Sequence, residues 1–404
     1  MLSLNQLPKS EKPTLESGSW GLQAVVFGLV AAAITNVYLT QPVLPVLEAE
    51  FGVSPSQASY TVSAVILGIA LANLPFGWLA DRVPVRSLIL SGGVVVCAAG
   101  LCCAATHSLP LLVAARFLQG LFVPALTTCL AAYLSANLPV EKLNVVMASY
   151  VSATTTGGLG GRLLGGMLPP LHWRYAFVSA AALLAGATVI AVWRLPPGRG
   201  PDKGRSGGEG FLTLLTHAEL RRIFLVAFGG FFVFSSVFNY LPFYLSGAPF
   251  HASTRLITLL YLSFLMGIII APLSGKLSNR IGNGGTMILG SLLFALAIAL
   301  TLIKSLVAIL AALVLVCAGF FSIHAAAAGS LNRKLTSSRG RANSLYILAY
   351  YLGGAAGITL SGYAYGLAGW PGVAALGITV LALPFATGLA ERRQEQGRGY
   401  AGSQ

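Results

Sequence analysis

The sequence predicts an all-α membrane protein with about twelve transmembrane helices in two pseudo-symmetric six-helix bundles. Only 9% of its 404 residues are charged, whereas soluble domains carry about 25% charged residues. The mean hydropathy of +0.79 indicates a chain that is surrounded largely by lipid. Short motifs also recur after about 200 residues, which indicates two related halves, as in many transporters.

The expected transmembrane helices are apolar nearly all round and rich in glycine and proline, which membrane helices tolerate. Each is close to the length of about 20 residues that a helix needs to cross a bilayer. The short alternating segments of a transmembrane β-barrel are not found in the sequence. The expected helices are 21–47, 56–79, 88–106, 109–135, 143–169, 173–193, 220–246, 253–277, 285–303, 306–331, 342–367 and 371–389.

The net charge of +14 has a topological meaning. If the N-terminus lies inside, 20 of the 25 Lys and Arg residues fall in cytoplasmic segments, and only Arg174, Arg255 and Lys304 fall in outer loops. This asymmetry follows the positive-inside rule. It predicts that both termini are cytoplasmic, and it argues against nucleic acid as a partner.

No cleavable signal peptide is expected, because the first 19 residues are polar and the apolar run after them is too long. The five cysteines all fall in expected helices without the spacing of metal ligands. We therefore interpret them as small apolar side chains, and we expect no metal site and no cofactor.

The longest polar stretch inside the chain is RLPPGRGPDKGRSGGEG, which begins at Arg194 and divides the expected helices six and six. Its Pro, Gly and charged residues are typical of a flexible linker. We expect an N-terminal bundle at 1–193, a cytoplasmic linker at 194–218 and a C-terminal bundle at 219–404, each bundle with a short cytoplasmic tail.

The two halves share several features at similar offsets. GWLADR at Gly77 and GKLSNR at Gly275 each follow the second helix of their half. The fifth and eleventh helices carry stripes of glycines four residues apart, a spacing that lets membrane helices approach closely. These helix-packing residues are Gly157, Gly161 and Gly165 in the first half and Gly353 and Gly357 in the second.

Four stretches carry a resemblance to a known family: NVYLTQPVLPVLEAEFGVSPSQ at 36–57, GWLADRVPVR at 77–86, RFLQG at 116–120 and GGLGGRLLGG at 157–166. Together they resemble the major facilitator superfamily, and in particular its bacterial drug- and sugar-efflux members. The resemblance covers nearly the whole chain. It implies a monomeric secondary transporter of the bacterial inner membrane, which works by alternating access and exports a small organic molecule, with protons as the expected coupling ion.

The resemblance also implies a gate at the cytoplasmic face, in which the charges of GWLADRVPVR latch the two halves together in one state. The alternative is a turn that only sets topology. Pro84 and Val85 depart from the family pattern, and the second copy has Asn279 in place of the acid. The candidate gating residues are Gly77, Asp81, Arg82, Arg86, Gly275 and Arg280.

Two arginines inside expected helices, Arg116 and Arg162, are the strongest candidates for substrate binding, because a charge at that depth is costly and usually faces a cavity or a partner. At 1.5 Å per residue, they lie roughly 9 Å and 12 Å from the outer ends of their helices, with Gln41 at roughly 10 Å. The three are expected to form one polar layer. The alternative is that each arginine snorkels outward or binds helix-end carbonyls.

None of the eleven acidic residues lies in the middle of an expected helix, and two buried cations without a buried acid indicate an anionic or zwitterionic substrate. For proton coupling, Asp81, Glu48 and His324 remain as candidates, although a histidine such as His324 is more often a satisfied structural residue than a coupling site. The other candidate substrate-binding residues are Asn36, Tyr38, Gln119, Asn239, Tyr240, Tyr244, Tyr261, Tyr346 and Tyr350.

Other functions stay open at this point. The efflux motif of the family has a Gly-Pro step where this chain has Gly157-Gly158, so an uptake permease or an uncoupled facilitator of a small anionic metabolite is the main alternative. A membrane enzyme would need a nucleophile–base pair or a metal cluster, and a receptor would need a further signalling domain. The phosphate-binding motif of ATP-driven transporters is not found.

Overall fold

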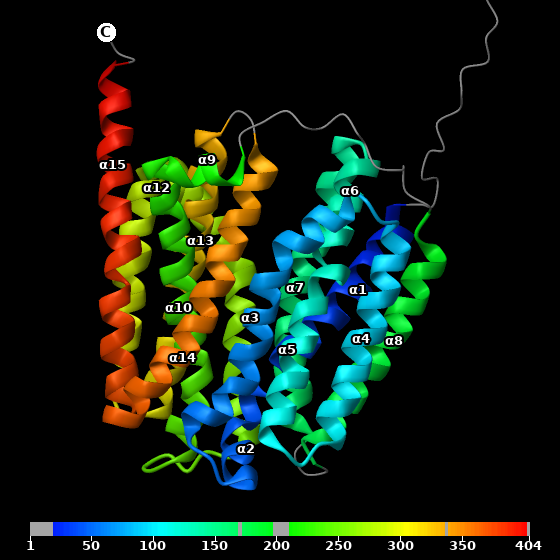
Figure 1. The fold of residues 1–404 in the computed structure, drawn as a ribbon. Helices are drawn as coiled ribbons and strands as arrows, with labels where there is room; N and C mark the ends of the chain where they lie inside the picture. Colours follow the sequence, from blue (N-terminus) through cyan, green and yellow to red (C-terminus); the bar gives the residue numbers. More distant parts are fainter. Residues whose placement is uncertain (1–18, 169–171, 197–209, 336–337, 402–404) are drawn as a thin grey trace, which may run out of the picture.

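The structure, a computed structural model, describes residues 19–168, 172–196, 210–335 and 338–401. Within these ranges all regular elements are helices, most of them long and running side by side in two groups (Figure 1). Most of the expected linker at 194–218 lies outside the described residues. A short helix, α9 (Phe211–Thr216), forms near its end.

Helices α1 to α8 make the first group, and α9 to α15 make the second (Figure 1). The first contains α1 (Ser19–Tyr38), η1 (Gln41–Val43), α2 (Leu44–Phe51), α3 (Pro55–Ala80), α4 (Val85–Ala105), α5 (Leu109–Leu126), α6 (Thr128–Asn137), α7 (Val140–Met167) and α8 (Arg174–Arg194). The second adds α10 (Ala218–Ser246), α11 (Thr254–Leu260), η2 (Tyr261–Leu265), α12 (Met266–Leu300), α13 (Leu306–Lys334), α14 (Arg339–Val380) and α15 (Ala382–Ala401).

In the described part of the chain, nine helical stretches are long and apolar enough to cross a membrane. Two of these contain two crossings each, because α12 breaks at Gly282 (φ 78°) and α14 breaks at Gly369 (φ 60°). A positive φ at a sharp turn favours glycine, which has no Cβ to clash. With α7, which packs along α1, the described helices provide the twelve crossings that the sequence predicts.

The first crossing differs from the continuous helix expected at 21–47. Helix α1 ends at Tyr38, and the chain continues through η1 into α2. Pro42 and Pro45 are the second residues of these two elements, within the first turn, where proline is tolerated because its missing N–H has no intrahelical acceptor there. The interruption leaves the last carbonyls of α1 without helical donors.

Arg116 of α5 occupies this helix end. Its side chain is fully buried. It donates from Nη1 to Asn36 O at 2.5 Å, from Nη2 to Val37 O at 2.5 Å and from Nε to Thr61 O of α3 at 2.9 Å. Nη1 also donates to Gln119 Oε1 at 2.7 Å. The cation thus caps the negative end of α1 and joins three helices of the first bundle.

The glycine stripes lie where helix backbones touch. A Cβ at Gly157 or Gly161 would lie 2.4 or 2.3 Å from a backbone carbonyl oxygen of α1, and one at Gly165 would lie 1.9 Å from the carbonyl oxygen of Leu39, directly after α1. A Cβ at Gly353 or Gly357 would lie 2.1 or 2.3 Å from a carbonyl oxygen of α10. The first and fifth crossings of each half therefore pack in the same way, as a duplication requires.

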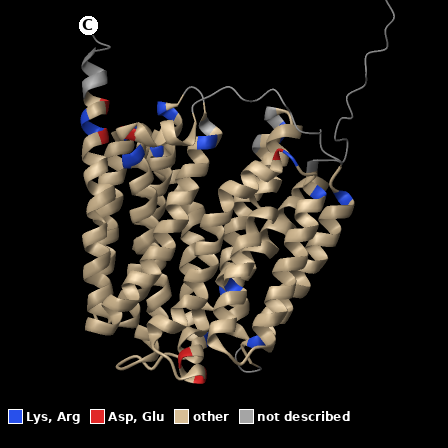
Figure 2. Ribbon diagram, in the orientation of Figure 1, with Lys and Arg blue, Asp and Glu red and all other residues tan. Residues whose placement is uncertain are grey.

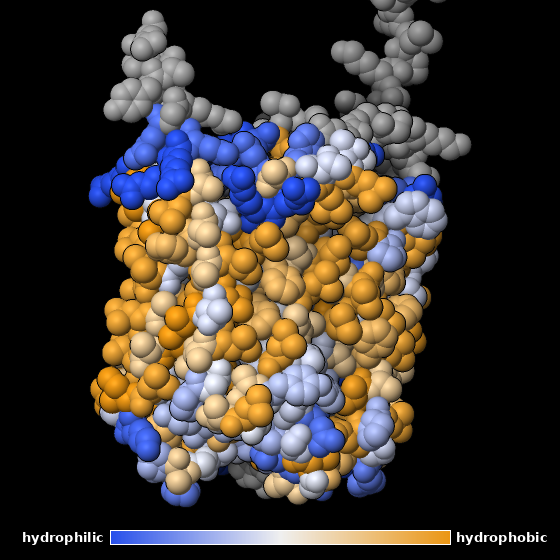
Figure 3. All heavy atoms as spheres, turned by 60° about the vertical axis from the view of Figure 1, so that its left-hand side comes forward, coloured by the Kyte–Doolittle hydropathy of each residue, from blue (hydrophilic) through white to orange (hydrophobic). Residues whose placement is uncertain are grey.

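Most charged residues lie at the two ends of the helix bundle, as expected for a protein that spans a membrane (Figure 2). Most Lys and Arg residues gather at the end of the bundle where the C-terminus lies, whereas acidic residues lie at both ends (Figure 2). Between the two ends, the surface is a broad hydrophobic belt with more hydrophilic residues above and below it (Figure 3).

We expect Gly161→Ala to lower the melting temperature of the protein in detergent, because the added methyl would lie 2.3 Å from Thr35 O and push α7 away from α1. Overpacking of this kind costs about 1–3 kcal/mol. Gly186→Ala in α8 is the matched control, because its Cβ would meet nothing within 4 Å. An equal melting temperature for both variants would contradict the backbone contact.

We expect Arg116→Met to lower the melting temperature further, because four oxygens lose their donor and each unsatisfied buried group costs about 1–3 kcal/mol. Thermal unfolding followed by tryptophan fluorescence measures the change. A variant that melts like the wild type but no longer transports would show that Arg116 serves the substrate instead.

Candidate functional site

The candidate site centres on Arg162 of α7, whose side chain is only 3% exposed. Its Nε donates to Gln41 Oε1 of η1 at 2.7 Å, and its Nη1 donates to Gly158 O in its own helix at 2.7 Å. Among the residues that the structure describes, Arg162 makes no ion pair with a carboxylate. Its charge is therefore met by an amide and a backbone carbonyl, which are neutral partners.

Aromatic rings from both halves surround the guanidinium. Its Cζ lies 4.0 Å from the centre of the Tyr38 ring in α1, and 4.2 Å and 5.4 Å from the rings of Phe264 and Tyr261 in η2. Cation–π contacts of this kind contribute about 2 kcal/mol or more when water is excluded. Arg162 thus lies at the junction of the two bundles and contacts each of them.

The second bundle supplies an aromatic wall next to Arg162. Tyr350 of α14 stacks on Phe231 of α10 with ring centres 3.8 Å apart, and Phe234 stacks on Phe320 of α13 at 4.0 Å. Tyr350 is half-buried, and the wall adjoins Arg162 through Phe264, whose ring centre lies 5.3 Å from that of Phe234. The wall offers flat apolar surfaces beside a cation, a combination that suits an aromatic or amphipathic anion.

His324 and Tyr346 extend this wall. The Tyr346 hydroxyl lies 2.9 Å from His324 Nδ1, so that α13 and α14 are joined by one hydrogen bond. The imidazole ring also lies 5.9 Å from the ring of Phe320 and 5.5 Å from that of Tyr350. His324 thus places an imidazole, which can bind a proton, among the aromatic rings around Tyr350.

The polar layer expected from helix depth divides into two groups. Gln41 lies against Arg162, whereas Arg116 has its own partners inside the first bundle. Gln119 belongs with Arg116, and its Nε2 donates to Val96 O at 3.1 Å. Asn36 is also buried there. The arginines differ because α5 faces the centre of the first bundle and α7 faces the second bundle.

Three other predicted residues lie elsewhere. Asn239 of α10 donates to Ser59 Oγ of α3 at 2.8 Å, a direct bond between the halves. Tyr240 donates to the backbone carbonyl of Ile358 in α14 at 2.8 Å. Tyr244 stacks parallel on Trp370 within the second bundle, with ring centres 4.9 Å apart. The structure does not bring these three to Arg162.

The halves also touch where α7 meets α11. A Cβ at Gly166 would lie 1.8 Å from Thr258 Oγ1. Together with the bond from Asn239 to Ser59 and the ring contacts of Arg162, this packing joins the two bundles toward the end at which α2 lies (Figure 1).

The candidate gating residues at the opposite end do not pair with one another. Asp81 is exposed, and within the described ranges its carboxylate makes no hydrogen bond or ion pair. Arg82 folds back over the Trp78 ring at 3.8 Å, and Arg86 donates from both Nε and Nη2 to Leu195 O. In this conformation the two arginines of GWLADRVPVR bind their own bundle, so the latch stays a prediction.

The glycines of the two repeated motifs are not in tight packing either. A Cβ at Gly275 would meet nothing within 4 Å, and one at Gly77 would lie 4.0 Å from Thr128 Cγ2. Neither of these glycines is therefore required for close helix packing in this conformation. Arg280, the arginine of the second motif, is exposed and lines a separate pocket described below.

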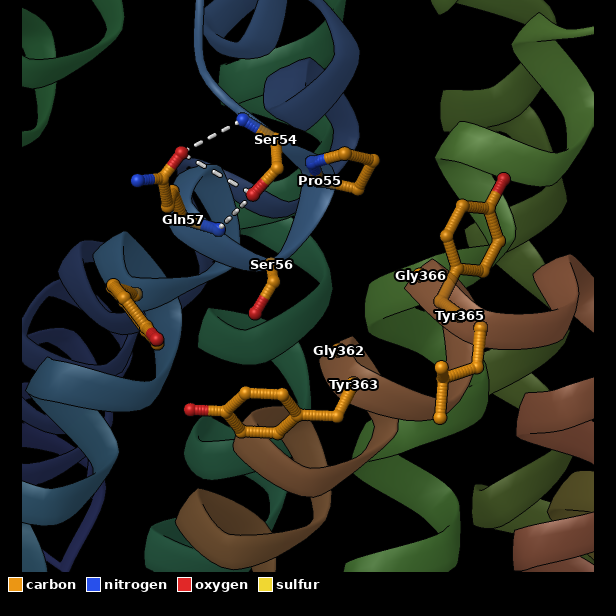
Figure 4. A pocket seen from close by; sticks show the side chains of 10 residues that line it. Ser54, Pro55, Ser56, Gln57, Gly362, Tyr363, Tyr365 and Gly366 are labelled. Atoms are coloured by element: carbon orange, nitrogen blue, oxygen red, sulfur yellow. Dashed lines mark hydrogen bonds between the residues drawn. The ribbon is translucent and has the colours of Figure 1, made fainter.

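A cavity of about 530 Å³ lies between the start of α3 and α14 (Figure 4). Ser54 and Gln57 close a capping box at its rim, in which Gln57 N donates to Ser54 Oγ at 3.3 Å and Ser54 N donates to Gln57 Oε1 at 3.0 Å. The spacing of these two residues is the usual helix-start signature. Because no charged side chain lines it, this cavity is a weaker candidate than the surroundings of Arg162.

Sequence reasoning missed the phenylalanines of the aromatic wall, Phe231, Phe234, Phe264 and Phe320. The run FFVFSSVF in α10 was the available signal. No group of three or more His, Cys, Asp or Glu side chains in the described part of the chain is placed to hold a metal ion.

Comparison with known proteins identifies the family. The profile of the Major Facilitator Superfamily matches residues 26–285 and 247–399. Inner membrane transport protein YnfM of Escherichia coli (strain K12) is 28% identical over 375 residues, which cover 91% of this chain and 90% of that protein. Probable transporter SCO4007 of Streptomyces coelicolor is 30% identical over 86% of this chain and 82% of that protein.

Uncharacterized MFS-type transporter YybF of Bacillus subtilis is 27% identical over 89% of this chain and 91% of that protein. Among solved structures, a bacterial homolog of the human lysosomal transporter Spinster, in an inward-facing and unoccupied conformation, has a TM-score of 0.75 and 16% identity. The match covers 93% of this chain and 97% of that chain, and it shows the same fold. The chain therefore belongs to the Major Facilitator Superfamily and is a multi-pass membrane transporter, not an enzyme.

Proposed function

We propose that this protein exports a small organic anion across the bacterial inner membrane by alternating access, with Arg162 as the residue that binds the anion. The observation that carries the proposal is the position of Arg162, buried where the bundles meet and without a carboxylate partner among the described residues. A buried cation without a counter-ion is costly, and an anionic substrate removes that cost.

The surroundings of Arg162 narrow the substrate class. The stacked rings of Phe231 and Tyr350, with the tilted ring of Phe320 beside them, favour a substrate that has a flat apolar part next to its negative group. Gln41 can donate or accept a hydrogen bond beside the guanidinium. Arg116, whose three side-chain nitrogens each donate to the protein itself, has a structural role in this proposal.

The distribution of charge indicates how the protein is oriented in the membrane, and the contacts between the bundles indicate its conformational state. We place both termini in the cytoplasm, because the basic end of the molecule carries the C-terminus (Figure 2). The bundles are joined toward the other end by Asn239 and Ser59, so the described conformation corresponds to a state that is open to the cytoplasm. The gating role of Asp81 then belongs to the opposite, outward-open state, in which the cytoplasmic ends meet.

Proton exchange is the expected driving force, with His324 as the candidate nearest to the aromatic wall. Uncoupled facilitation or uptake of an anion is the second candidate function. It is favoured by the lack of an ion-paired carboxylate at Arg162 in the described structure, because a proton relay in a membrane normally uses Asp, Glu or His.

Arg162→Gln is expected to raise the KM for organic anions about 10- to 100-fold, because it removes charge-assisted hydrogen bonds to the substrate. Uptake of radiolabelled benzoate, salicylate and succinate into proteoliposomes measures the change, and Lys276→Gln on the exposed surface is the control. Arg162→Lys keeps the charge and should retain part of the activity. Unchanged anion transport by well-folded Arg162→Gln protein would overturn the anion-binding role.

An imposed pH gradient is expected to accelerate net anion transport by the wild-type protein in the same proteoliposomes. His324→Gln should abolish this acceleration and keep anion exchange at equal pH, since the imidazole is the group that would carry the proton. If the pH gradient does not change the rate of anion transport by the wild-type protein, the protein is instead an uncoupled facilitator.

A further inference from the structure

A second pocket lies away from the junction of the bundles, at the end of the molecule that carries the C-terminus. It has a volume of about 560 Å³ and is formed by the break in α12, the end of α13 and the polar part of α15. Three arginines, Arg280, Arg333 and Arg392, line it together with Glu395. All four belong to the second bundle, so the pocket is separate from Arg162.

The pocket has an excess of positive charge. Glu395 is its acidic residue, and its Oε1 lies 3.3 Å from Arg333 Nη2. The same carboxylate accepts from the backbone N–H groups of Asn283 at 3.0 Å and Gly284 at 3.3 Å, which start the second part of α12. Within the described structure, Arg280 and Arg392 have no acidic partner and are exposed.

Close backbone packing fixes the shape of the pocket. A Cβ at Gly282, where φ is 78°, would lie 2.2 Å from Glu395 Oε2. A Cβ at Gly284 would lie 2.3 Å from the backbone N of Arg392. The turn in α12 therefore holds α15 at a fixed distance, and with it Arg392 and Glu395.

The pocket borders the hydrophobic belt. On this side of the molecule, hydrophilic residues gather directly above a broad apolar surface (Figure 3). Helix α12 contributes Leu273 and Ile281, which are 51% and 45% exposed, and Ile281 also lines the pocket. A ligand held here could thus place an anionic group among the arginines and apolar chains against α12.

We propose that this pocket binds the headgroup of an anionic phospholipid, with Arg280 and Arg392 paired to the phosphodiester. Arginine forms charge-assisted, often bidentate hydrogen bonds with phosphate oxygens, and basic pockets at the cytoplasmic side of membrane helices suit such headgroups. The neighbouring apolar surface selects a lipid over a free phosphate ion. Bound lipid would brace α15 against α12.

Binding of phosphatidylglycerol to the full-length protein in detergent, followed by native mass spectrometry, tests the proposal. Phosphatidylglycerol is expected to bind more tightly than phosphatidylcholine, and Arg280→Gln/Arg392→Gln should weaken its binding about 30-fold, since each arginine near an anionic membrane surface contributes about a factor of five. Arg393→Gln, the next residue on α15 and outside the pocket lining, is the matched control and should bind like the wild type.

Two outcomes would overturn the lipid site: equal binding of the two lipids, or an equal loss in the double variant and in Arg393→Gln. Full displacement of phosphatidylglycerol by 10 mM inorganic phosphate would also overturn it, in favour of a phosphate site. Arg280→Lys/Arg392→Lys guards against misfolding in the Gln variant, because it keeps both charges and should keep most of the preference for phosphatidylglycerol.

Discussion

In the part of the chain that the structure describes, two arginines are buried in the interior of a membrane protein, and each is stabilised there without a carboxylate partner. The interruption of the first crossing serves both of them. The free carbonyls at the end of α1 accept from Arg116, while Tyr38 and Gln41, on either side of the break, contact Arg162. One local departure from helical structure thus supplies two cations with different kinds of partner, carbonyl oxygens in one case and rings and an amide in the other.

The second constraint is the contact between backbones. Glycines in α7 and α14 bring these helices onto α1 and α10 at distances that no other residue allows. Each pair therefore packs as one unit, and the two pairs occupy equivalent places in the two halves. The two helix pairs nevertheless carry different side chains: the pair in the first half carries Arg162, and the pair in the second half carries the phenylalanines of α10. Internal symmetry of the backbone is compatible with a binding site that is polar on one side and aromatic on the other.

Much of this was accessible from the sequence. The apolar runs, the repeated motifs and the glycine spacing are local patterns, and they predict the twelve crossings, the two halves and the family. Helix depth placed Gln41 beside Arg162 correctly and grouped Arg116 with them wrongly. Depth gives the height of a residue in the membrane but not the direction in which it faces, and α5 turns Arg116 toward the centre of its own bundle.

Contacts between segments that lie far apart in the chain could not be predicted from the sequence. Phe264 lies about 100 residues from Arg162 in the sequence, and Glu395 lies at a similar separation from Gly282. The packing of whole helices against one another decides which of these residues meet, and no local pattern records it. The interruption of α1 is an intermediate case, since Pro42 and Pro45 signal a possible break but not the arginine that caps it.

The rings around Arg162 have a consequence for the transport cycle. Tyr38 belongs to one half and Phe264 to the other, so a rocking motion that separates the halves at this level strips the guanidinium of part of its covering. In an empty carrier, water would have to enter the space that the rings leave beside the exposed charge. A bound anion would instead stay with the guanidinium and neutralise its charge. For the anionic substrate proposed above, the arginine would then slow the return of the empty carrier, and exchange of one anion for another would be faster than net transport.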